Sequence, residues 1–442
     1  MGPMPSARSG RAAVWMALFA GLVAFFAATY SFRDITDTDV NSLQTRALVL
    51  HGDIDVSRYQ LAPKALAVVW RGGRYSIYGV GVSLPAAPIY AVATRMGASE
   101  PVLQAAASIP FVAVSVLLMF TLLLRLFPRG LAVGGTVLFA FGTTMWPLAA
   151  MGFFQNGPQA VFQLLGLLGV FTESKWGPPL AGLGFAAATF VRPLTGIALI
   201  FAGLFYLLRG RRYVTSYVLG AVLPLLGVIV QNRWIWGGWL TGGYSHNIVG
   251  FHGDVPHALW GLLFGWWRGL FVYSPVLVVA FVGFVIAARR RRSNEDHRML
   301  LLGAIAVATV ALYAKFTTWH GGGNQFGYRY LLDAVPFLIP LVLYAIQKAP
   351  WTRRPAVLLG ALSILTTTFG AGPNNFGYDA KLFTTRFDEA SIGQAWIAAV
   401  HQPGGAFLRV LGVAAFALLF FVASTRLSPA HDRGASVGAG AG

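Results

Sequence analysis

Long apolar runs without charged residues recur along the chain from residue 13 to residue 424, and short polar segments separate them. A helix needs about 20 mostly apolar residues to cross a bilayer, and many of these runs approach that length. The pattern predicts an all-α polytopic membrane protein with about 12 transmembrane helices. The predicted spans lie near residues 13–30, 102–124, 131–149, 158–172, 178–190, 194–208, 213–232, 265–288, 299–317, 331–347, 355–371 and 406–424.

One further apolar segment, residues 79–97, is not counted as a span. It contains Pro85 and Pro88, which disrupt the interior of a helix. If this segment crossed the membrane, every later cluster of positive charge would move to the outer side. We therefore expect an interfacial or re-entrant helix on the outer face.

Basic residues predict how the chain is oriented. Short connections between the predicted spans, together with the two ends of the chain, hold 18 of the 33 lysines and arginines, and such residues stay on the cytoplasmic side. Both termini are then cytoplasmic, and the apolar run Ala12 to Ala28 is an uncleaved first helix rather than a signal peptide. Residues 1–427 form one transmembrane domain, and residues 428–442 form a disordered cytoplasmic tail. The outer segments are 31–101, 233–264, 318–330 and 372–405.

Composition excludes several classes of protein. The 442 residues are 56% apolar and only 11% charged, whereas soluble domains carry about 25% charged residues. A net charge of +18 would suggest a nucleic-acid partner in a soluble protein, but here the basic residues beside the spans account for it, and no nucleic-acid partner is expected. The chain has no cysteine, which excludes disulfides and thiolate chemistry.

The sequence contains no recognisable cofactor motif. No carboxylate and histidine cluster has metal-ligand spacing, so we expect no metal site and no cofactor, and a divalent metal has no support. The phosphate-binding pattern GxxxxGK[ST] is also missing from the sequence, so ATP-driven transport by this chain is not supported.

Acidic residues gather directly after the first predicted span. Five of the 15 acids lie in this stretch, namely Asp34, Asp37, Asp39, Asp53 and Asp55. Asp37 and Asp39 should lie at the membrane surface, where a carboxylate could act as a general base on the hydroxyl of a lipid-borne acceptor. The alternative is that they cap a helix beginning near Val40. Asp53 and Asp55 are expected to form a turn.

Three single arginines lie at predicted outer ends of helices: Arg192, Arg268 and Arg329. An arginine near the apolar phase is costly unless it is paired or reaches the interface. Its planar guanidinium group matches phosphate oxygens. Each could therefore be an interfacial anchor, or several could converge on a phosphate-carrying substrate, with Arg329 the best candidate.

The segment TTWHGGGNQFGYRYLLDAVP, residues 317–336, combines glycines, polar groups and aromatic rings. Glycines permit close approach of the backbone to a ligand. His320 and Asn324 offer polar contacts, and Trp319 and Tyr328 offer faces for a sugar or lipid. The alternative is an interfacial aromatic belt around a flexible turn.

The order and spacing of several motifs resemble the GT-C class of integral-membrane glycosyltransferases, over nearly the whole chain. The resemblance is to bacterial relatives of the protein O-mannosyltransferases and of the aminoarabinose transferases that modify lipid A. It is carried by the acidic outer loop, the element around Gly52 and Asp53, G-x-Y-S at Gly73 to Ser76, TTMWPLAAMGFFQNGPQ, VRP, RGLFVYSP and WHGG...GYRYLLDAVPF.

The resemblance implies a GT-C-like bundle with juxtamembrane helices and loops on the extracytoplasmic side. It implies transfer of a sugar, usually with inversion, from a polyprenyl-phosphate donor to a membrane lipid, glycolipid, glycan or protein acceptor. Mannose and arabinofuranose are the sugars considered. By family analogy the essential acid is Asp37, with Asp39 as the fallback.

The same resemblance places Arg268 and Arg329, and less directly Arg192, at the donor phosphate. Tyr75 of the G-x-Y-S motif is a candidate substrate contact. The Ala-, Gly- and Arg-rich composition suggests a bacterial source, hence an inner-membrane protein whose active site faces the periplasm or the cell exterior.

Two departures from the family pattern leave other functions open. Relatives often carry a Lys-x-Pro-Pro element after the Tyr-Ser pair, where this chain has Ile77 to Val80, so Lys64, Arg71 or Arg74 would have to replace its basic contact. Gln155 and Asn156 stand where many relatives have His or Asp. The alternatives are a lipid or solute transporter, or flippase, and a non-catalytic scaffold of the same fold.

Overall fold

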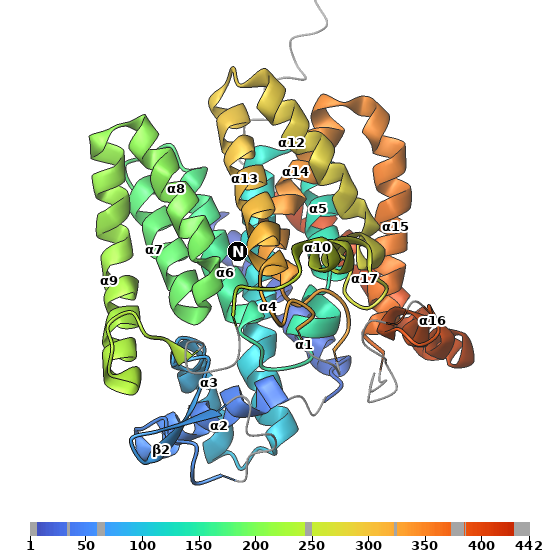
Figure 1. Cartoon of the computed structure of the whole chain (residues 1–442). Coiled ribbons are helices and arrows are strands. Elements are labelled where there is room, and N and C mark those ends of the chain that lie inside the picture. The colour runs from blue at the N-terminus through green and yellow to red at the C-terminus, as the bar shows by residue number, and fades with distance from the viewer. Residues whose placement is uncertain are drawn as a thin grey trace, which may run out of the picture.

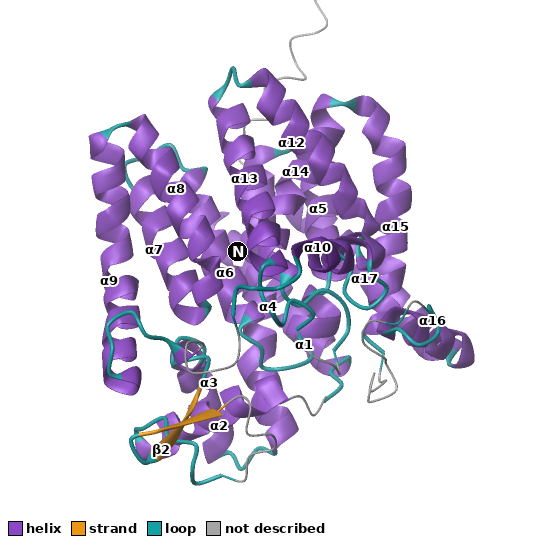
Figure 2. Cartoon of the chain, viewed as in Figure 1, coloured by secondary structure: helices purple, strands orange, loops and turns teal. Residues whose placement is uncertain are grey.

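The computed structural model describes residues 7–32, 36–59, 67–243, 250–321, 325–372, 384 and 386–427. Most of the described chain forms helices that stand side by side, with a short hairpin at one end of the bundle (Figures 1 and 2). The chain is an all-α polytopic membrane protein, as the apolar runs predicted. Six helices are long and apolar enough to cross a membrane, and four shorter apolar helices accompany them among the described residues.

The elements follow one another in this order. The first part of the chain forms α1 (Ala7–Ala28), α2 (Thr36–His51), β1 (Ala67–Trp70), β2 (Gly73–Ser76), α3 (Ser83–Arg95), α4 (Glu100–Leu126), α5 (Arg129–Phe141), η2 (Met145–Ala149) and α6 (Asn156–Val170). The middle forms α7 (Gly177–Val191), η3 (Pro193–Thr195), α8 (Gly196–Arg209), α9 (Arg211–Trp236), α10 (Val255–Phe264), α11 (Leu270–Tyr273), η5 (Pro275–Val278) and α12 (Val279–Arg290). The last part forms α13 (Asn294–Ala314), η6 (Leu331–Ala334), α14 (Val335–Lys348), η7 (Pro350–Thr352), α15 (Arg353–Gly370), α16 (Ser391–His401) and α17 (Pro403–Leu427).

All the predicted spans fall on helices, but two of them are interrupted. The predicted span 131–149 is the helix α5 followed by the π-helical turn η2, which contains Pro147. The predicted span 265–288 was wrong at its start, because residues 265–269 form a turn and the helix is broken again before Pro275. Proline lacks the backbone N–H and clashes with the preceding turn of a helix, which explains both breaks.

A β-hairpin between α2 and α3 was not predicted. Strands β1 and β2 pair antiparallel, with Trp70 opposite Gly73. The two residues between them, Arg71 and Gly72, both have positive φ, at +48° and +83°. Such dihedral angles fit the two-residue turns that match the twist of a hairpin, and glycine adopts them without a steric penalty.

The helix predicted near Val40 begins four residues earlier, at Thr36. Helix α3 forms within the segment 79–97 and lies with α2 at the hairpin end of the bundle (Figure 1). Its location on the outer face remains a prediction. The middle of the bundle is tightly packed. Its helices leave no room for a Cβ atom at Gly184 of α7, which would clash with the backbone of Gly166 in α6. Residues 428–442, the predicted tail, lie outside the described residues.

Candidate active site

Two of the predicted site residues, Asp37 and Arg329, form an ion pair between Asp37 Oδ2 and Arg329 Nη1. Asp37 lies in the first turn of α2, where the helix dipole favours a negative charge. Arg329 lies in the turn immediately before η6. Only 8% of Asp37 and 4% of Arg329 are exposed. The pair therefore joins segments that are far apart in the sequence at a buried point near the hairpin end of the bundle.

The backbone before Arg329 fixes where its side chain can reach. Gly327 has a φ of +75°, which L-residues with side chains rarely adopt. A Cβ at Gly327 would also clash with the Thr144 side chain. The guanidinium carbon of Arg329 lies 4.8 Å from the centre of the Phe154 ring, a distance at which a cation is attracted to an aromatic face.

Arg329 keeps one donor atom without a hydrogen-bond partner among the described residues, its buried Nε. Burial also lowers the pKa of the Arg329 side chain, because removal from water disfavours its charged form. A guanidinium group that already faces a carboxylate and still has a spare N–H donor can bind a further anion by donating to it, for example to a phosphate oxygen.

A second, deeper ion pair lies behind the first and involves a residue that the sequence analysis missed. Arg192 Nε lies 2.8 Å from Asp333 Oδ2, and both side chains are 2% exposed. The hydroxyl of Tyr313 donates to the same Asp333 oxygen, and Arg192 Nε donates to that hydroxyl at 3.1 Å. Asp333 lies in the apolar stretch Leu331–Lys348, where an acid is costly unless paired. That cost was the signal in the sequence that could have identified it.

Asn156 connects the two ion pairs. Its Nδ2 donates to Asp333 Oδ1 at 3.1 Å and to the Arg329 backbone carbonyl at 3.2 Å. The ring of Tyr330 stacks on Tyr313 with 4.8 Å between centres. The segment that carries Arg329 is thus anchored to α6 and α13 by polar contacts and ring packing.

Arg268 is buried in the turn before α11, and backbone carbonyls hold its guanidinium group. Its Nε donates to the His320 carbonyl at 2.8 Å, and its Nη1 donates to the Trp267 and Gln325 carbonyls at 2.7 and 3.0 Å. Burial lowers the pKa of Arg268 to about 10, which leaves the side chain cationic at neutral pH. The guanidinium carbon of Arg329 lies 5.9 Å from the centre of the Tyr330 ring.

The glycine-rich segment contributes packing and backbone contacts. Trp319 is 5% exposed, with its ring 6.1 Å from that of Trp267. Tyr328 is buried and its hydroxyl lies 2.6 Å from Ser274 Oγ. Burial and the nearby Arg268 charge lower the pKa of His320. Asn324, the fourth polar or aromatic candidate of this segment, lies outside the described residues.

The other predicted residues make contacts of their own. Asp39 accepts a hydrogen bond from Gln104 Nε2 at 2.9 Å. Asp53 forms an ion pair with Arg58, and its Oδ1 also accepts from the Asp55 backbone N–H, so the predicted turn is confirmed. Tyr75 lies in β2 with its ring 6.4 Å from that of Trp236.

Arg71 and Arg74 also lie at the hairpin, and Lys64 lies outside the described residues. Among the described residues, no group of three or more histidines and acids could hold a metal ion.

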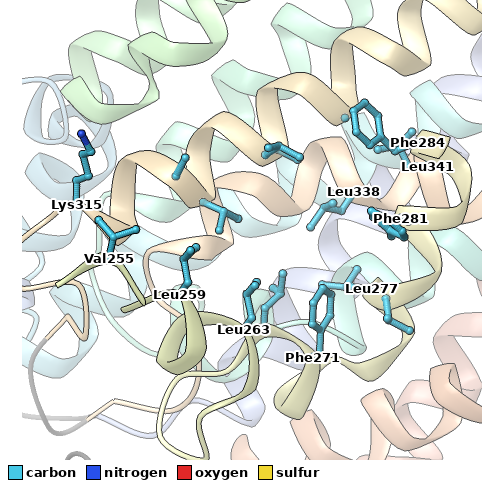
Figure 3. A pocket seen from close by; sticks show the side chains of 18 residues that line it. Val255, Leu259, Leu263, Phe271, Leu277, Phe281, Phe284, Lys315, Leu338 and Leu341 are labelled. Carbon is cyan, nitrogen blue, oxygen red and sulfur yellow. The ribbon is translucent and has the colours of Figure 1, made fainter. Parts of the chain in front are cut away.

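An apolar pocket of about 570 Å³ opens on the flank of the bundle between α10, α12, α13 and α14. Its walls are hydrophobic side chains, and its one charged lining residue is Lys315. Lys315 lies at one end and Phe284 and Leu341 at the other (Figure 3). Lys315 directly follows α13 and begins the segment that reaches His320, whose carbonyl binds Arg268. The Lys315 end of the pocket is therefore joined by a short segment to the residue that contacts Arg268.

Comparisons with known proteins support the fold. No family model matches the chain, and no curated protein matches its sequence. The structure is similar to that of ArnT from Cupriavidus metallidurans in the apo state, with a TM-score of 0.50 and 17% identity over 95% of this chain and 76% of ArnT. It is likewise similar to ArnT bound to undecaprenyl phosphate, with a TM-score of 0.50 and 15% identity over 95% and 75% of the two chains. The chain has the GT-C fold that its motifs led us to expect.

Proposed function

We propose that this protein is a glycosyltransferase that moves a sugar from a polyprenyl-phosphate donor to an acceptor on the extracytoplasmic face of the membrane. The observation that carries the proposal is the buried Asp37–Arg329 pair. A carboxylate can accept a proton, and guanidinium groups can stabilise a phosphate leaving group. A neighbouring structure of the same fold contains undecaprenyl phosphate, which supports a donor of this kind.

The proposed reaction is a single displacement at the anomeric carbon. The acceptor oxygen attacks that carbon while Asp37 takes the hydroxyl proton, and the bond from the carbon to the phosphate oxygen breaks. The polyprenyl phosphate leaves with the bonding electron pair, and the configuration of the sugar inverts. Negative charge grows on the leaving phosphate, so a fixed Arg268 and Arg329 favour the transition state more than the bound donor.

The ion pair suggests how the donor prepares the base. In the structure Arg329 is bound to Asp37, whose side chain is 12% exposed. A donor phosphate would compete with Asp37 for Arg329 and use its available Nε. Asp37 would then be released towards the acceptor only when donor is bound. Arg192 contacts Asp333 and Tyr313 through its Nε, so we assign it the role of supporting the site rather than of binding phosphate directly.

Replacing Arg329 by alanine is expected to reduce kcat by about 100- to 1000-fold, the usual loss when one group that stabilises transition-state charge is removed. Arg329→Lys should recover part of the rate, because lysine keeps the positive charge. Recovery should be incomplete, because lysine lacks the planar pair of donors. The measurement is steady-state transfer from a labelled polyprenyl-phosphate sugar. The control is Arg386→Ala, since Arg386 forms an exposed ion pair with Asp388. Equal rates for Arg329→Ala and the control would remove Arg329 from the mechanism.

The apolar pocket suits the hydrocarbon chain of the donor. Apolar side chains line it along α10, α12, α13 and α14, and Lys315 lies at one end, where the segment leading to the Arg268 contact His320 begins. Burial of each CH₂ group in such a pocket contributes about 0.8 kcal/mol. We therefore propose that the pocket binds isoprene units of the donor while the phosphate reaches Arg268 and Arg329.

A tryptophan in place of Val307 should block the pocket without disturbing the core, because Val307 lines it and is 56% exposed. The expected result is a KM at least about tenfold higher for a long-chain donor, equivalent to the loss of two buried CH₂ groups. A donor with a single short prenyl chain should be affected much less. Val357→Trp is the matched control, since Val357 is an exposed valine of α15. An equal rise for both donors, or for both variants, would exclude the pocket as the chain-binding site.

The function itself is tested by incubating the purified full chain with a panel of radiolabelled polyprenyl-phosphate sugars and a membrane-lipid extract. A labelled product identifies the donor, and separation of lipid, glycan and protein fractions identifies the acceptor. Movement of the labelled lipid across vesicles without any new glycosidic product would instead establish a transporter. Folded protein that shows neither behaviour would support a scaffold.

A further inference from the structure

A second hollow, of about 510 Å³, lies between the α6–α7 connection and the beginning of α9. It is at the opposite end of the bundle from the Asp37–Arg329 pair. Helix α6 begins at Asn156, which contacts the candidate site, and ends 14 residues later at Val170, about 21 Å away along the helix axis. Helix α9 likewise begins at Arg211 beside the hollow and ends at Trp236 beside the hairpin. The hollow therefore plays no part in the proposed reaction.

The hollow is electropositive. Lys175 and Arg212 line it, and within the described chain neither side chain forms an ion pair with a carboxylate. The lining acid, Glu173, is already neutralised by Arg298 at 2.7 Å. Helices α7 and α9 both begin at this place, at Gly177 and Arg211, and helix N-termini carry partial positive charge. Two cationic side chains and two helix ends thus face one small space.

The hollow is also preformed. Helices α7 and α9 are in backbone contact beside it, since a Cβ atom at Gly220 would clash with the carbonyl oxygen of Pro179. Pro178 and Pro179 occupy the first turn of α7, where their fixed φ suits a helix start. A rigid site loses less conformational entropy when a ligand binds.

Hydrocarbon-facing residues continue from the hollow along α9. Leu219 lines the hollow and is 69% exposed, and Leu223, one turn further, is 76% exposed. Trp176 and Tyr213 flank the charged groups, as aromatic residues do at the boundary between membrane and water. A ligand that fits this arrangement carries a phosphate group at the charged residues of the hollow and hydrocarbon chains along Leu219 and Leu223.

From this arrangement we infer that the hollow is a binding site for the phosphate headgroup of an anionic phospholipid, with its acyl chains lying along α9. Basic pockets between transmembrane helices bind such headgroups, and each nearby Lys or Arg contributes about 1 kcal/mol. The positive-inside rule predicts that this end of the bundle is cytoplasmic. The site would hold a lipid of the inner leaflet and tie the α6–α7 connection to α9.

The test is the affinity of the detergent-solubilised full chain for phosphatidylglycerol, cardiolipin and phosphatidylcholine, measured by native mass spectrometry. Lys175→Gln with Arg212→Gln should weaken binding of the two anionic lipids by about 10- to 30-fold, from the two charges removed, and leave phosphatidylcholine unchanged. The matched control removes two charges elsewhere on the basic end, through Arg289→Gln with Arg290→Gln; both residues are exposed at the end of α12.

The inference is overturned if the control pair weakens anionic-lipid binding as much as the Lys175 and Arg212 pair, or if neither does. Glycerol 3-phosphate separates the lipid from a free phosphate compound. A soluble phosphate that binds as tightly as phosphatidylglycerol would show that the acyl chains contribute nothing, and would contradict a lipid site. Because these measurements involve no sugar transfer, they stand or fall independently of the proposed glycosyltransferase activity.

Discussion

Replacing Asp37 by asparagine is expected to abolish sugar transfer while leaving the protein folded and extractable. The asparagine side chain has almost the same shape but cannot accept the proton of the acceptor hydroxyl. General-base catalysis typically contributes 100- to 10,000-fold to the rate, so kcat should fall by about that factor. Binding of the donor should be retained or become tighter, because Arg329 loses its carboxylate partner and is available to the phosphate.

Asp39→Asn is the matched control for this prediction. Asp39 lies two residues further along α2 and accepts a hydrogen bond from Gln104, so the substitution removes one carboxylate from the same helical turn. We expect it to change the rate by less than about tenfold, because an amide oxygen can still accept that hydrogen bond. The measurement is single-turnover transfer with donor binding determined separately. If Asp39→Asn lost the activity and Asp37→Asn kept it, the assignment of the base would move to Asp39.

The arrangement of apolar residues was sufficient to predict the helices, because transmembrane helices are specified by length and hydropathy. Their interruptions were harder to predict. Pro147 and Pro275 lie within apolar runs, and only the structure distinguishes a kinked helix from a broken one. The β-hairpin was missed because its turn, Arg71 and Gly72, has a weak sequence signal, since only one of its two residues is a glycine.

The candidate site was predicted in part. The sequence indicated both Asp37 and Arg329, one as an acid at the membrane surface and one as an arginine beside aromatic residues, but no pattern indicated that they pair. Contacts between residues almost 300 positions apart depend on how helices pack, and spacing along the chain does not encode this. The sequence predicted Arg192 as a possible phosphate contact, whereas in the structure it pairs with the buried Asp333.

The two ion pairs differ in a way that matters for function. The Asp37 side chain is 12% exposed and Arg329 has a spare donor nitrogen, so their partners can be exchanged when a substrate arrives. Arg192 and Asp333 are almost completely buried and share the Tyr313 hydroxyl, so their contacts are permanent. Asn156 connects the permanent pair to the backbone of the exchangeable one. A fixed support of this kind is what a reactive pair needs to stay within catalytic distance.

Removing one partner of the deeper pair should destabilise the protein strongly. Asp333→Ala leaves Arg192 as an uncompensated charge at 2% exposure, and breaking a buried ion pair in this way costs about 3–5 kcal/mol. Arg192→Met likewise leaves Asp333 as an uncompensated buried charge. The double variant removes both charges, and replacing a buried pair by apolar side chains is often neutral, so it should be more stable than either single variant.

Thermal unfolding of the three variants in detergent measures this order. Both single variants should unfold at a clearly lower temperature than the unmodified protein. The unfolding temperature of the double variant should lie between those of the single variants and that of the unmodified protein. The double variant should still transfer sugar more slowly, because Asn156 loses its Asp333 contact and holds Arg329 less firmly. Strictly additive losses in the double variant would mean that Arg192 and Asp333 do not stabilise one another, and the support assigned to Arg329 would then have to come from its packing on Phe154 and Tyr330.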